Sequence, residues 1–253
     1  MIWTHKVSRE WMEARKKYLT ASGVSSIIPF TATGKPRNVD SKYFEIWAAT
    51  RTAITEDDLY SHGAAARGHL LEPYAIAEFN ALERASWVMH QWDDALIFND
   101  HGTAFSPDGM MISQNEFKGV EIDEDELPSY TACIEVKSYG YAKHYACGVC
   151  NKFALEERWQ LAHAMAVSDK ISIIYLVFYN PSCKERLFVH TYKRDDLEKE
   201  IELCKEAAKE YFNRVPGFEE QADLLGYPGK LANEQQIQEM LLLDQNKTVI
   251  NPR

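Results

Sequence analysis

The pattern of hydrophobic and polar residues divides the 253-residue chain into an N-terminal part with helical periodicity and a central part with strand periodicity. The longest stretch of helical spacing runs from Gly63 to Arg84, where apolar residues recur every three or four positions. Shorter helices are predicted over 9–18 and 42–52, with another beginning near Val24. Ser8 is the expected N-cap of the helix 9–18, and Ser22 is the expected N-cap of the helix that begins near Val24.

Beyond residue 86 the pattern changes to runs of β-branched and aromatic residues, and helices then alternate with strands. The predicted strands are 87–91, 95–98, 104–112, 132–136, 171–179 and 187–192, and the predicted helices are 154–167 and 195–212. The acidic run 121–126 is expected to be a solvated loop. Helices followed by a mixed sheet, a helix, two strands and a helix predict an α/β or α+β fold.

The segment beyond Pro216 differs from the rest because glycine and proline recur in it. A short helix is expected over 234–243. We therefore expect residues 1–215 to form one large domain and residues 216–253 to form a C-terminal appendage.

The composition limits which class of protein this chain can be, but it says little about the reaction. Hydrophobic residues make up 45% of the chain and charged residues 26%, which allows a sizeable core. No stretch is long and apolar enough to span a bilayer, and the first residues lack the apolar segment of a secretory signal, so a cytoplasmic location is expected. The net charge of −10 counts against nucleic-acid binding, although local basic surface governs encounter more than the total does.

The chain contains five cysteines, and an odd number in a long chain favours reduced thiols over a disulfide framework. Cys147 and Cys150 form a CxxC pair, which His144 could join. A structural zinc site needs four ligands, and no second pair accompanies this one. The favoured interpretation is two small residues in a loop.

Two short segments near the middle of the chain carry candidate chemistry: SPDG at 106–109 and IEVK at 134–137. Taken singly, the first is typical of a turn and the second of an alternating strand. Because side chains two positions apart in a strand leave the same face, Glu135 and Lys137 point the same way. If Asp108 lies beside them, two carboxylates and an ammonium group converge, and the Val136 carbonyl can complete a cation site. Such a set suits phosphodiester hydrolysis assisted by Mg²⁺, with Mn²⁺ as an acceptable substitute.

Further motifs accompany this pair along the chain. They are Trp11-x3-Arg15 leading into Leu19-Thr20-Ala21-Ser22, Gly68 with Glu72, Gln160, and Tyr179-Asn180-Pro181. Each motif alone is weak evidence, but together, in this order and at these spacings, they are specific. The chain up to about residue 212 thus resembles the PD-(D/E)xK nuclease superfamily and, within it, the phage lambda exonuclease (YqaJ-like viral recombinase) family.

The resemblance implies a restriction-endonuclease-like core, a central mixed β-sheet flanked by helices. It implies catalytic roles for Lys137, Glu135, Asp108, Glu72 and Gln160. Two Mg²⁺ ions are implied, and their expected ligands are Asp108, Glu135, Glu72 and the carbonyl of Val136. Without the other motifs, Glu72 would be a solvated helix charge and Gln160 only a polar helix residue.

A separate site for a 5′-phosphate is implied by Arg15 and Ser22, which resemble the family's phosphate pocket. An arginine fork and a helix N-terminus both suit a phosphate group, whereas a surface salt bridge and a simple cap are the alternatives. Lys35 and Arg37, in the basic loop 31–40, are further candidates for this site or else solvated charges.

The sequence departs from the family pattern at two places. Ala64-Ala65-Ala66 stands where the family has an aliphatic wedge that parts the two DNA strands. His163 and Ala164 stand where related nucleases often have a tyrosine after the glutamine, and we expect His163 to be structural.

The implied activity is stepwise hydrolysis of one strand of duplex DNA from 5′-phosphorylated ends, which releases mononucleotides and leaves 3′ overhangs. A homotrimeric ring around DNA and a single-strand annealing protein as partner in phage-type recombination are also implied. Two alternatives remain open. One is a structure-specific endonuclease of the same superfamily, and the other is a catalytically silent DNA-end-binding or DNA-mimicking protein, which the net charge permits.

Overall fold

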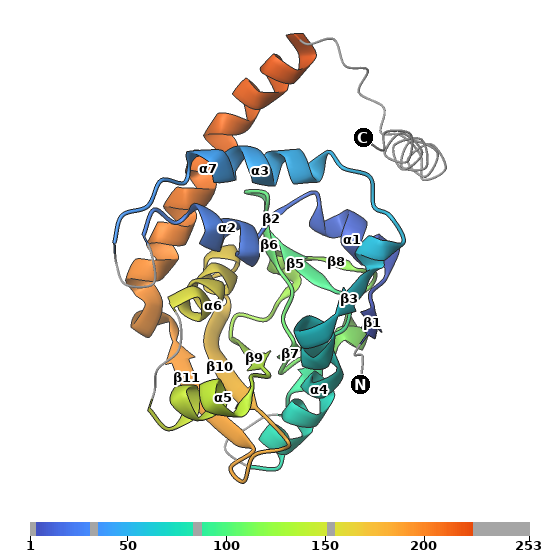
Figure 1. Ribbon diagram of the computed structural model, residues 1–253, viewed down its shortest axis with the longest axis vertical. Helices are drawn as coiled ribbons and strands as arrows, with labels where there is room; N and C mark the ends of the chain where they lie inside the picture. The colour runs from blue at the N-terminus through green and yellow to red at the C-terminus, as the bar shows by residue number, and fades with distance from the viewer. Residues whose placement is uncertain (1–3, 31–34, 83–87, 151–154, 225–253) are drawn as a thin grey trace, which may run out of the picture.

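A five-stranded mixed β-sheet forms the centre of the computed structural model, which describes residues 4–30, 35–82, 88–150 and 155–224 (Figure 1). The strands lie in the order β11-β10-β9-β7-β4. Their bounds are β4 His90–Gln91, β7 Gly109–Met110, β9 Thr131–Lys137, β10 Ile171–Tyr179 and β11 Leu187–Lys193. β9 and β10 are parallel and the other neighbours are antiparallel. The expectation of a mixed sheet within an α/β fold is confirmed.

Helices cover both faces of this sheet. α4 (Gly63–Asn80) packs on one face, whereas α5 (Tyr141–Gly148) and α6 (Leu155–Val167) pack on the other. α7 (Glu198–Leu224) packs along α6, and its end projects from the body of the molecule (Figure 1). One apolar cluster lies between each face of the sheet and the helices that cover it. Successive residues of a strand point to opposite faces, so they belong alternately to one cluster and to the other.

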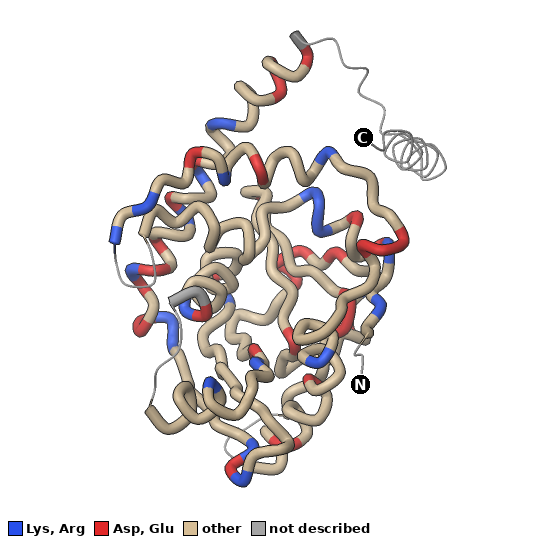
Figure 2. The backbone as a smooth tube through the Cα atoms, viewed as in Figure 1, with Lys and Arg blue, Asp and Glu red and all other residues tan. Residues whose placement is uncertain are grey.

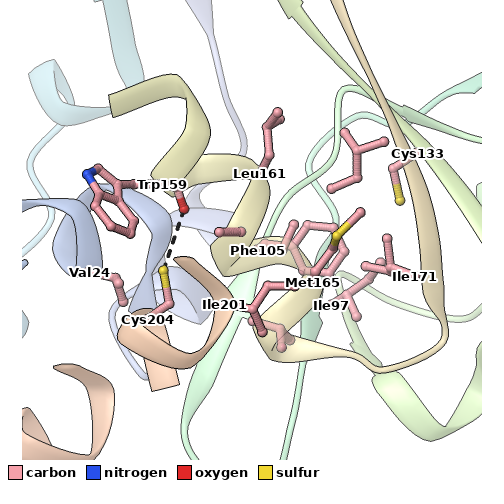
Figure 3. Close-up of a cluster of buried hydrophobic side chains, with 14 of the residues drawn as sticks. Val24, Ile97, Phe105, Cys133, Trp159, Leu161, Met165, Ile171, Ile201 and Cys204 are labelled. Carbon is pink, nitrogen blue, oxygen red and sulfur yellow. Dashed lines mark hydrogen bonds between the residues drawn. The ribbon is translucent and has the colours of Figure 1, made fainter. Parts of the chain in front are cut away.

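The larger cluster lies beneath α6 and α7. Figure 3 shows Leu161 and Met165 of α6 turned toward buried side chains from the strands, and Cys204 of α7 beside Trp159. The thiol of Cys204 donates a hydrogen bond to the Trp159 carbonyl over 3.8 Å. Burying each large apolar side chain stabilises the fold by roughly 1.5–3 kcal/mol. The two long helices are therefore held to the sheet by a continuous apolar interface.

The remaining elements form the N-terminal side of the molecule. A second sheet has the order β2-β6-β5-β8, and a two-stranded sheet joins β1 to β3. The strand bounds are β1 Thr4–Lys6, β2 Leu19–Thr20, β3 Tyr60–His62, β5 Leu96–Phe98, β6 Thr103–Phe105 and β8 Glu121–Asp123. The helix bounds are α1 Arg9–Arg15, α2 Ala21–Ile27 and α3 Asp40–Thr50. Short 3-10 turns occupy Asp57–Leu59, Gln114–Glu116, Glu124–Glu126 and Arg194–Leu197.

Several local predictions need correction. α1 begins after the expected N-cap, Ser8, but ends at Arg15, three residues before Tyr18. The N-cap of α2 is Thr20 and not Ser22, because residues 19–20 are extended and pair with β6, so the helix begins directly after them. The acidic run 121–126 is not simply a loop, since its first part is strand β8 with Ile122 buried. Cys147 is buried in helix α5 rather than in a loop.

The C-terminal helix extends further than predicted. α7 continues past Phe212 and through Pro216 to Leu224. A proline inside a helix removes one backbone hydrogen bond, and here the ring of Phe218 packs edge-on against Phe44 just beyond it. The expected domain boundary at 215/216 therefore falls within a helix. The expected short helix over 234–243 lies outside the described residues, and a separate appendage stays a prediction.

None of the helices within residues 4–30, 35–82, 88–150 and 155–224 combines the length and the apolar character that a membrane crossing requires.

The stability of the fold should depend on pH through His163 of α6. This side chain is 1% exposed, and its Nε2 lies 2.9 Å from the Ala104 carbonyl, which fits the expected structural role. Burial lowers the pKa of His163 to about 4, so the unfolded chain binds the proton more readily. Stability is therefore complete above the unfolded pKa of about 6.5 and is lost below it, by about 2 kcal/mol between pH 7 and pH 5.

Urea unfolding of the wild type and of His163→Gln at pH 7 and pH 5 measures this contribution. The variant is expected to lose about 2 kcal/mol less than the wild type over this interval. The comparison of two pH values cancels any packing defect that the substitution introduces. An identical pH dependence in both proteins would show that His163 is not the group responsible.

Candidate active site

A polar network occupies the face of β9 that is turned toward α6. Ala132, Ile134 and Val136 belong to the apolar cluster under α4, so Glu135 and Lys137 emerge on the opposite face. The Lys137 Nζ donates to Glu135 Oε1 over 2.6 Å and to Gln160 Oε1 of α6 over 2.8 Å. The Gln160 Nε2 in turn donates to Glu135 Oε1 over 2.6 Å. The predicted common face of Glu135 and Lys137 is confirmed, and Gln160 joins them.

Asp108 reaches the same strand from the segment that precedes β7. Its Oδ2 accepts a hydrogen bond of 2.6 Å from the backbone N–H of Val136, 28 positions away in the chain. Pairing of β7 with β9 places Gly109 opposite Ile134. A Cβ at Gly109 would come within 2.8 Å of both the His90 carbonyl oxygen and the Ile134 side chain, so only glycine permits this close approach. The structure thus brings the SPDG and IEVK segments together.

The Asp108 carboxyl is buried close to two other acidic side chains, and this surrounding disfavours its charged form. Burial raises the pKa of Asp108 well above its usual value, and the charges of Glu135 and Glu72 raise it further. Burial acts to lower the pKa of Lys137, but the nearby charges of Glu135 and Asp108 outweigh it and raise the pKa. Lys137 therefore remains an ammonium group at neutral pH, and it offsets only part of the negative charge.

Glu72 lies on α4, close enough to Asp108 for its charge to raise the pKa of that carboxyl, but it does not line the pocket beside Glu135. Its Oε1 lies 3.1 Å from Nδ1 of His69, one turn earlier in the helix. The hydrogen bond to Glu72 raises the pKa of His69, and the His69 ring stacks on His5 at 4.7 Å. The sequence interpretation did not identify His69. Its position three residues before Glu72 is the signal that would have found it.

A pocket of about 360 Å³ lies next to the Glu135–Lys137–Gln160 network. Arg15 and Ser22 line this pocket together with those three residues. The Arg15 guanidinium stacks on Trp11 at 4.5 Å, and burial lowers the pKa of Arg15. Within the part of the chain that the structure describes, no carboxylate pairs with this guanidinium. A desolvated cation without a counterion is suited to receive an anion.

The two other predicted phosphate ligands lie elsewhere. Arg37 donates to the carbonyls of Ile28 and Ser25 and so ties its loop to the end of α2. Lys35 is exposed, and neither residue is among those that line the pocket. Their contribution to phosphate binding stays a prediction.

Tyr139 and Glu157 also line the pocket and were not identified from the sequence. Glu157 is 6% exposed and accepts a hydrogen bond from the Tyr139 hydroxyl. Burial, together with this hydrogen bond, raises the pKa of Tyr139. Glu157 lies one turn before Gln160 in α6, and this helical spacing is the signal that would have placed both residues on one face.

A larger cavity of about 660 Å³ lies elsewhere, between α6, α7 and the turn before β6. His163, Cys204 and Lys205 are among the residues that line it. Its lining includes neither Glu135 and Lys137 nor Arg15, so the smaller pocket is the candidate active site.

The oxygen atoms of the site meet the requirements of a divalent cation only in part. Among the residues described, no three acidic, histidine or cysteine side chains form a ready-made metal cage. Mg²⁺ needs only one or two carboxylates, with water and phosphate oxygens at its other positions. Asp108, Glu135 and the Val136 carbonyl supply hard oxygens, and the repulsion that raises the pKa of Asp108 is what a bound cation would relieve. The residues fit such an ion once Glu135 is released from Lys137.

Comparisons with known proteins agree with this geometry. Residues 10–171 match the family described as the YqaJ-like viral recombinase domain. Two crystal structures of LHK-Exo share the fold: an alkaline exonuclease from Laribacter hongkongensis at 22% identity, and LHK-Exo in complex with dAMP at 21% identity. Each has a TM-score of 0.59, and each comparison covers 86% of this chain and 100% of the other. No curated protein matches the sequence. The expected lambda-exonuclease type of fold is confirmed.

Proposed function

We infer the function from one premise, that the chain belongs to the family of YqaJ-like viral recombinase domains. We propose that it is a metal-dependent deoxyribonuclease that degrades one strand of duplex DNA from 5′-phosphorylated ends, releasing mononucleotides and leaving 3′ overhangs. The observation that supports this proposal most strongly is the pocket shared by Arg15, Ser22 and the Glu135–Lys137–Gln160 network.

The proposed cofactor is a pair of Mg²⁺ ions, for which Mn²⁺ can substitute. Their proposed ligands are Asp108, Glu135, Glu72 and the Val136 carbonyl. Bound divalent ions of this kind lower the pKa of water and stabilise the attacking and leaving oxygens of an in-line displacement.

The protein side chains position the reacting groups. Lys137 orients the attacking water and offsets charge on the scissile phosphate. Gln160 contacts both Lys137 and Glu135, so it restricts the rotamers of both side chains. These hydrogen bonds keep the three side chains beside one another in the pocket before the cation and DNA arrive.

Arg15 and Ser22 are proposed to hold the terminal 5′-phosphate. An anchored end would place the next phosphodiester at Glu135 and Lys137, across a pocket of about 360 Å³. Cleavage there would release one nucleotide at a time and would require a DNA end. The structure of LHK-Exo in complex with dAMP contains a nucleotide of this product class.

The net charge of −10 does not oppose this proposal. Figure 2 shows Lys and Arg positions interspersed with Asp and Glu along α7, so acidic charge there does not form a continuous run. Arg15 and Lys137 supply local positive charge inside the pocket. Local charge of this kind governs the encounter with a phosphate more than the total does.

The test of the proposed function is digestion of linear duplexes labelled at either end, with 5′-phosphate or 5′-hydroxyl termini, in Mg²⁺ or EDTA. Release of labelled mononucleotide from phosphorylated 5′ ends, only in Mg²⁺, is expected. Cleavage of closed circular duplex as fast as linear duplex would instead support the endonuclease alternative. Failure to release acid-soluble nucleotides in Mg²⁺ would support the catalytically silent end-binding alternative.

In the same assay, Arg15→Ala is expected to lower the preference for 5′-phosphorylated over 5′-hydroxyl ends by about 10- to 100-fold, because a hydrogen bond to a charged group contributes roughly 1.5–3 kcal/mol. Arg51→Ala is the matched control, since Arg51 also stacks on a tryptophan, Trp47, at 5.1 Å. Equal discrimination by the wild type and Arg15→Ala would remove Arg15 from the phosphate site.

Family membership also supports proposing a homotrimeric ring and a single-strand annealing protein as partner in phage-type recombination. A ring would retain duplex DNA by enclosure and so reduce the need for a basic surface.

A further inference from the structure

One oxygen of Glu157 is buried in the candidate pocket without a hydrogen-bond partner. The other oxygen, Oε1, accepts from the Tyr139 hydroxyl and from Lys143 Nζ over 3.3 Å. Oε2 is buried, and it accepts from no donor among the described residues. Leaving a buried charged acceptor unpaired costs free energy. A donor that reaches Oε2 in another state of the protein would remove this cost.

Several donors line the same pocket, and among them Lys137 is the cation on which the charge of Glu157 already acts. In this structure its ammonium group is held by Glu135 Oε1 and Gln160 Oε1. Burial acts to lower the pKa of Lys137, and the charge of Glu157 is among those that outweigh this effect. Glu157 and Gln160 are one helical turn apart on α6 and share one face of it. A lysine that is already bound to Gln160 therefore lies near Glu157.

The contact between Lys137 and Glu135 is incompatible with a divalent cation at the same oxygen. Glu135 Oε1 already accepts from two donors, Lys137 Nζ and Gln160 Nε2, each over 2.6 Å. A cation bound there would stand within a few ångströms of the ammonium group, and like charges repel strongly at that distance in a buried site. Lys137 then needs another buried carboxylate.

We propose that Glu157 is a positioning residue, whose free oxygen receives the ammonium group of Lys137 when a divalent cation occupies Glu135. This inference rests on the proposed metal-dependent function. The exchange breaks one ion pair and forms another, and no proton is transferred. Tyr139 and Lys143 hold the first oxygen of Glu157, so the second keeps a defined direction. Lys137 thereby stays charged and ordered in the pocket after the metal has taken Glu135.

A double-mutant cycle tests the coupling without using activity. Mn²⁺ is titrated into DNA-free protein, and the free ion is followed by electron paramagnetic resonance. The proteins are the wild type, Glu157→Gln, Lys137→Met and the double variant. Glutamine keeps an acceptor for Tyr139 and nearly the same shape. Glu157→Gln is expected to weaken Mn²⁺ binding about 5- to 10-fold when Lys137 is present and less than about twofold when it is methionine.

The control is Glu206→Gln, which removes one negative charge from the exposed face of α7 and is expected to leave Mn²⁺ affinity unchanged. If Glu157→Gln weakens Mn²⁺ binding equally in the wild-type and the Lys137→Met proteins, Glu157 acts only through its general electrostatic field. That result overturns the inference about Glu157 but leaves the proposed metal-dependent function standing. Absence of Mn²⁺ binding by the wild type overturns the proposed metal-dependent function and the inference with it.

Discussion

Lys137→Ala is expected to lower the single-turnover cleavage rate by about 10³-fold, because removal of one preorganised charge at a reacting phosphate typically costs about 10²–10³-fold. Binding of DNA ends should change little, since the terminal phosphate is proposed to contact Arg15 rather than Lys137. The rate is measured with excess enzyme on end-labelled duplex in Mg²⁺. Affinity is measured by fluorescence anisotropy with Ca²⁺ in place of Mg²⁺.

Lys17→Ala is the matched control for this variant. Lys17 also forms an ion pair of 2.6 Å, with Glu121, but on the surface and away from the pocket. It should retain the wild-type rate, because exposed ion pairs contribute about 0–1 kcal/mol to stability. A Lys137→Ala rate within tenfold of the wild type would show that the catalytic lysine has been misassigned.

Asp108→Asn is expected to abolish cleavage and at the same time to make the metal-free protein more stable. The Asp108 carboxylate is buried beside the negative charges of Glu135 and Glu72. Asparagine removes the cost of burying that charge and the repulsion, and its side-chain oxygen can still accept from the Val136 N–H. Relief of about 1 kcal/mol would raise the melting temperature by about 2–4 °C in a domain of this size.

Melting in EDTA and cleavage in Mg²⁺ measure the two effects separately. Asp57→Asn is the control, since this aspartate is exposed in the turn before β3 and should affect neither quantity. A lower melting temperature for Asp108→Asn would contradict the idea that burial and charge repulsion destabilise a carboxylate at this position. Retained cleavage would remove Asp108 from the proposed metal ligands.

The alternation of residues in β9 explains why part of the site could be predicted. Side-chain direction in a strand depends only on odd and even positions, so Glu135 and Lys137 had to share a face. The apolar run 171–179 likewise predicted strand β10 with both of its ends correct. The direction of a side chain and the ends of a strand depend on residues that are close in the chain, so the sequence pattern is sufficient to predict them.

The errors occurred where a distant segment altered a local preference. Thr20 rather than Ser22 caps α2 because residues 19–20 pair with residues 103–104. Ile122 is buried and β8 forms because its acidic stretch pairs with β5. α7 passes through Pro216 although proline disfavours a helix interior, and Phe218 beyond it packs on Phe44.

The periodicity and motifs of this chain were sufficient to predict its mixed sheet, its main helices and its family resemblance, because such signals arise between near neighbours. Only packing decided that Asp108 meets the Val136 N–H across 28 positions, that Arg15 and Lys137 line one pocket, and that one oxygen of Glu157 has no partner among the described residues. Distances between remote segments are set by how helices and sheets fill space against one another, and a linear pattern does not contain them.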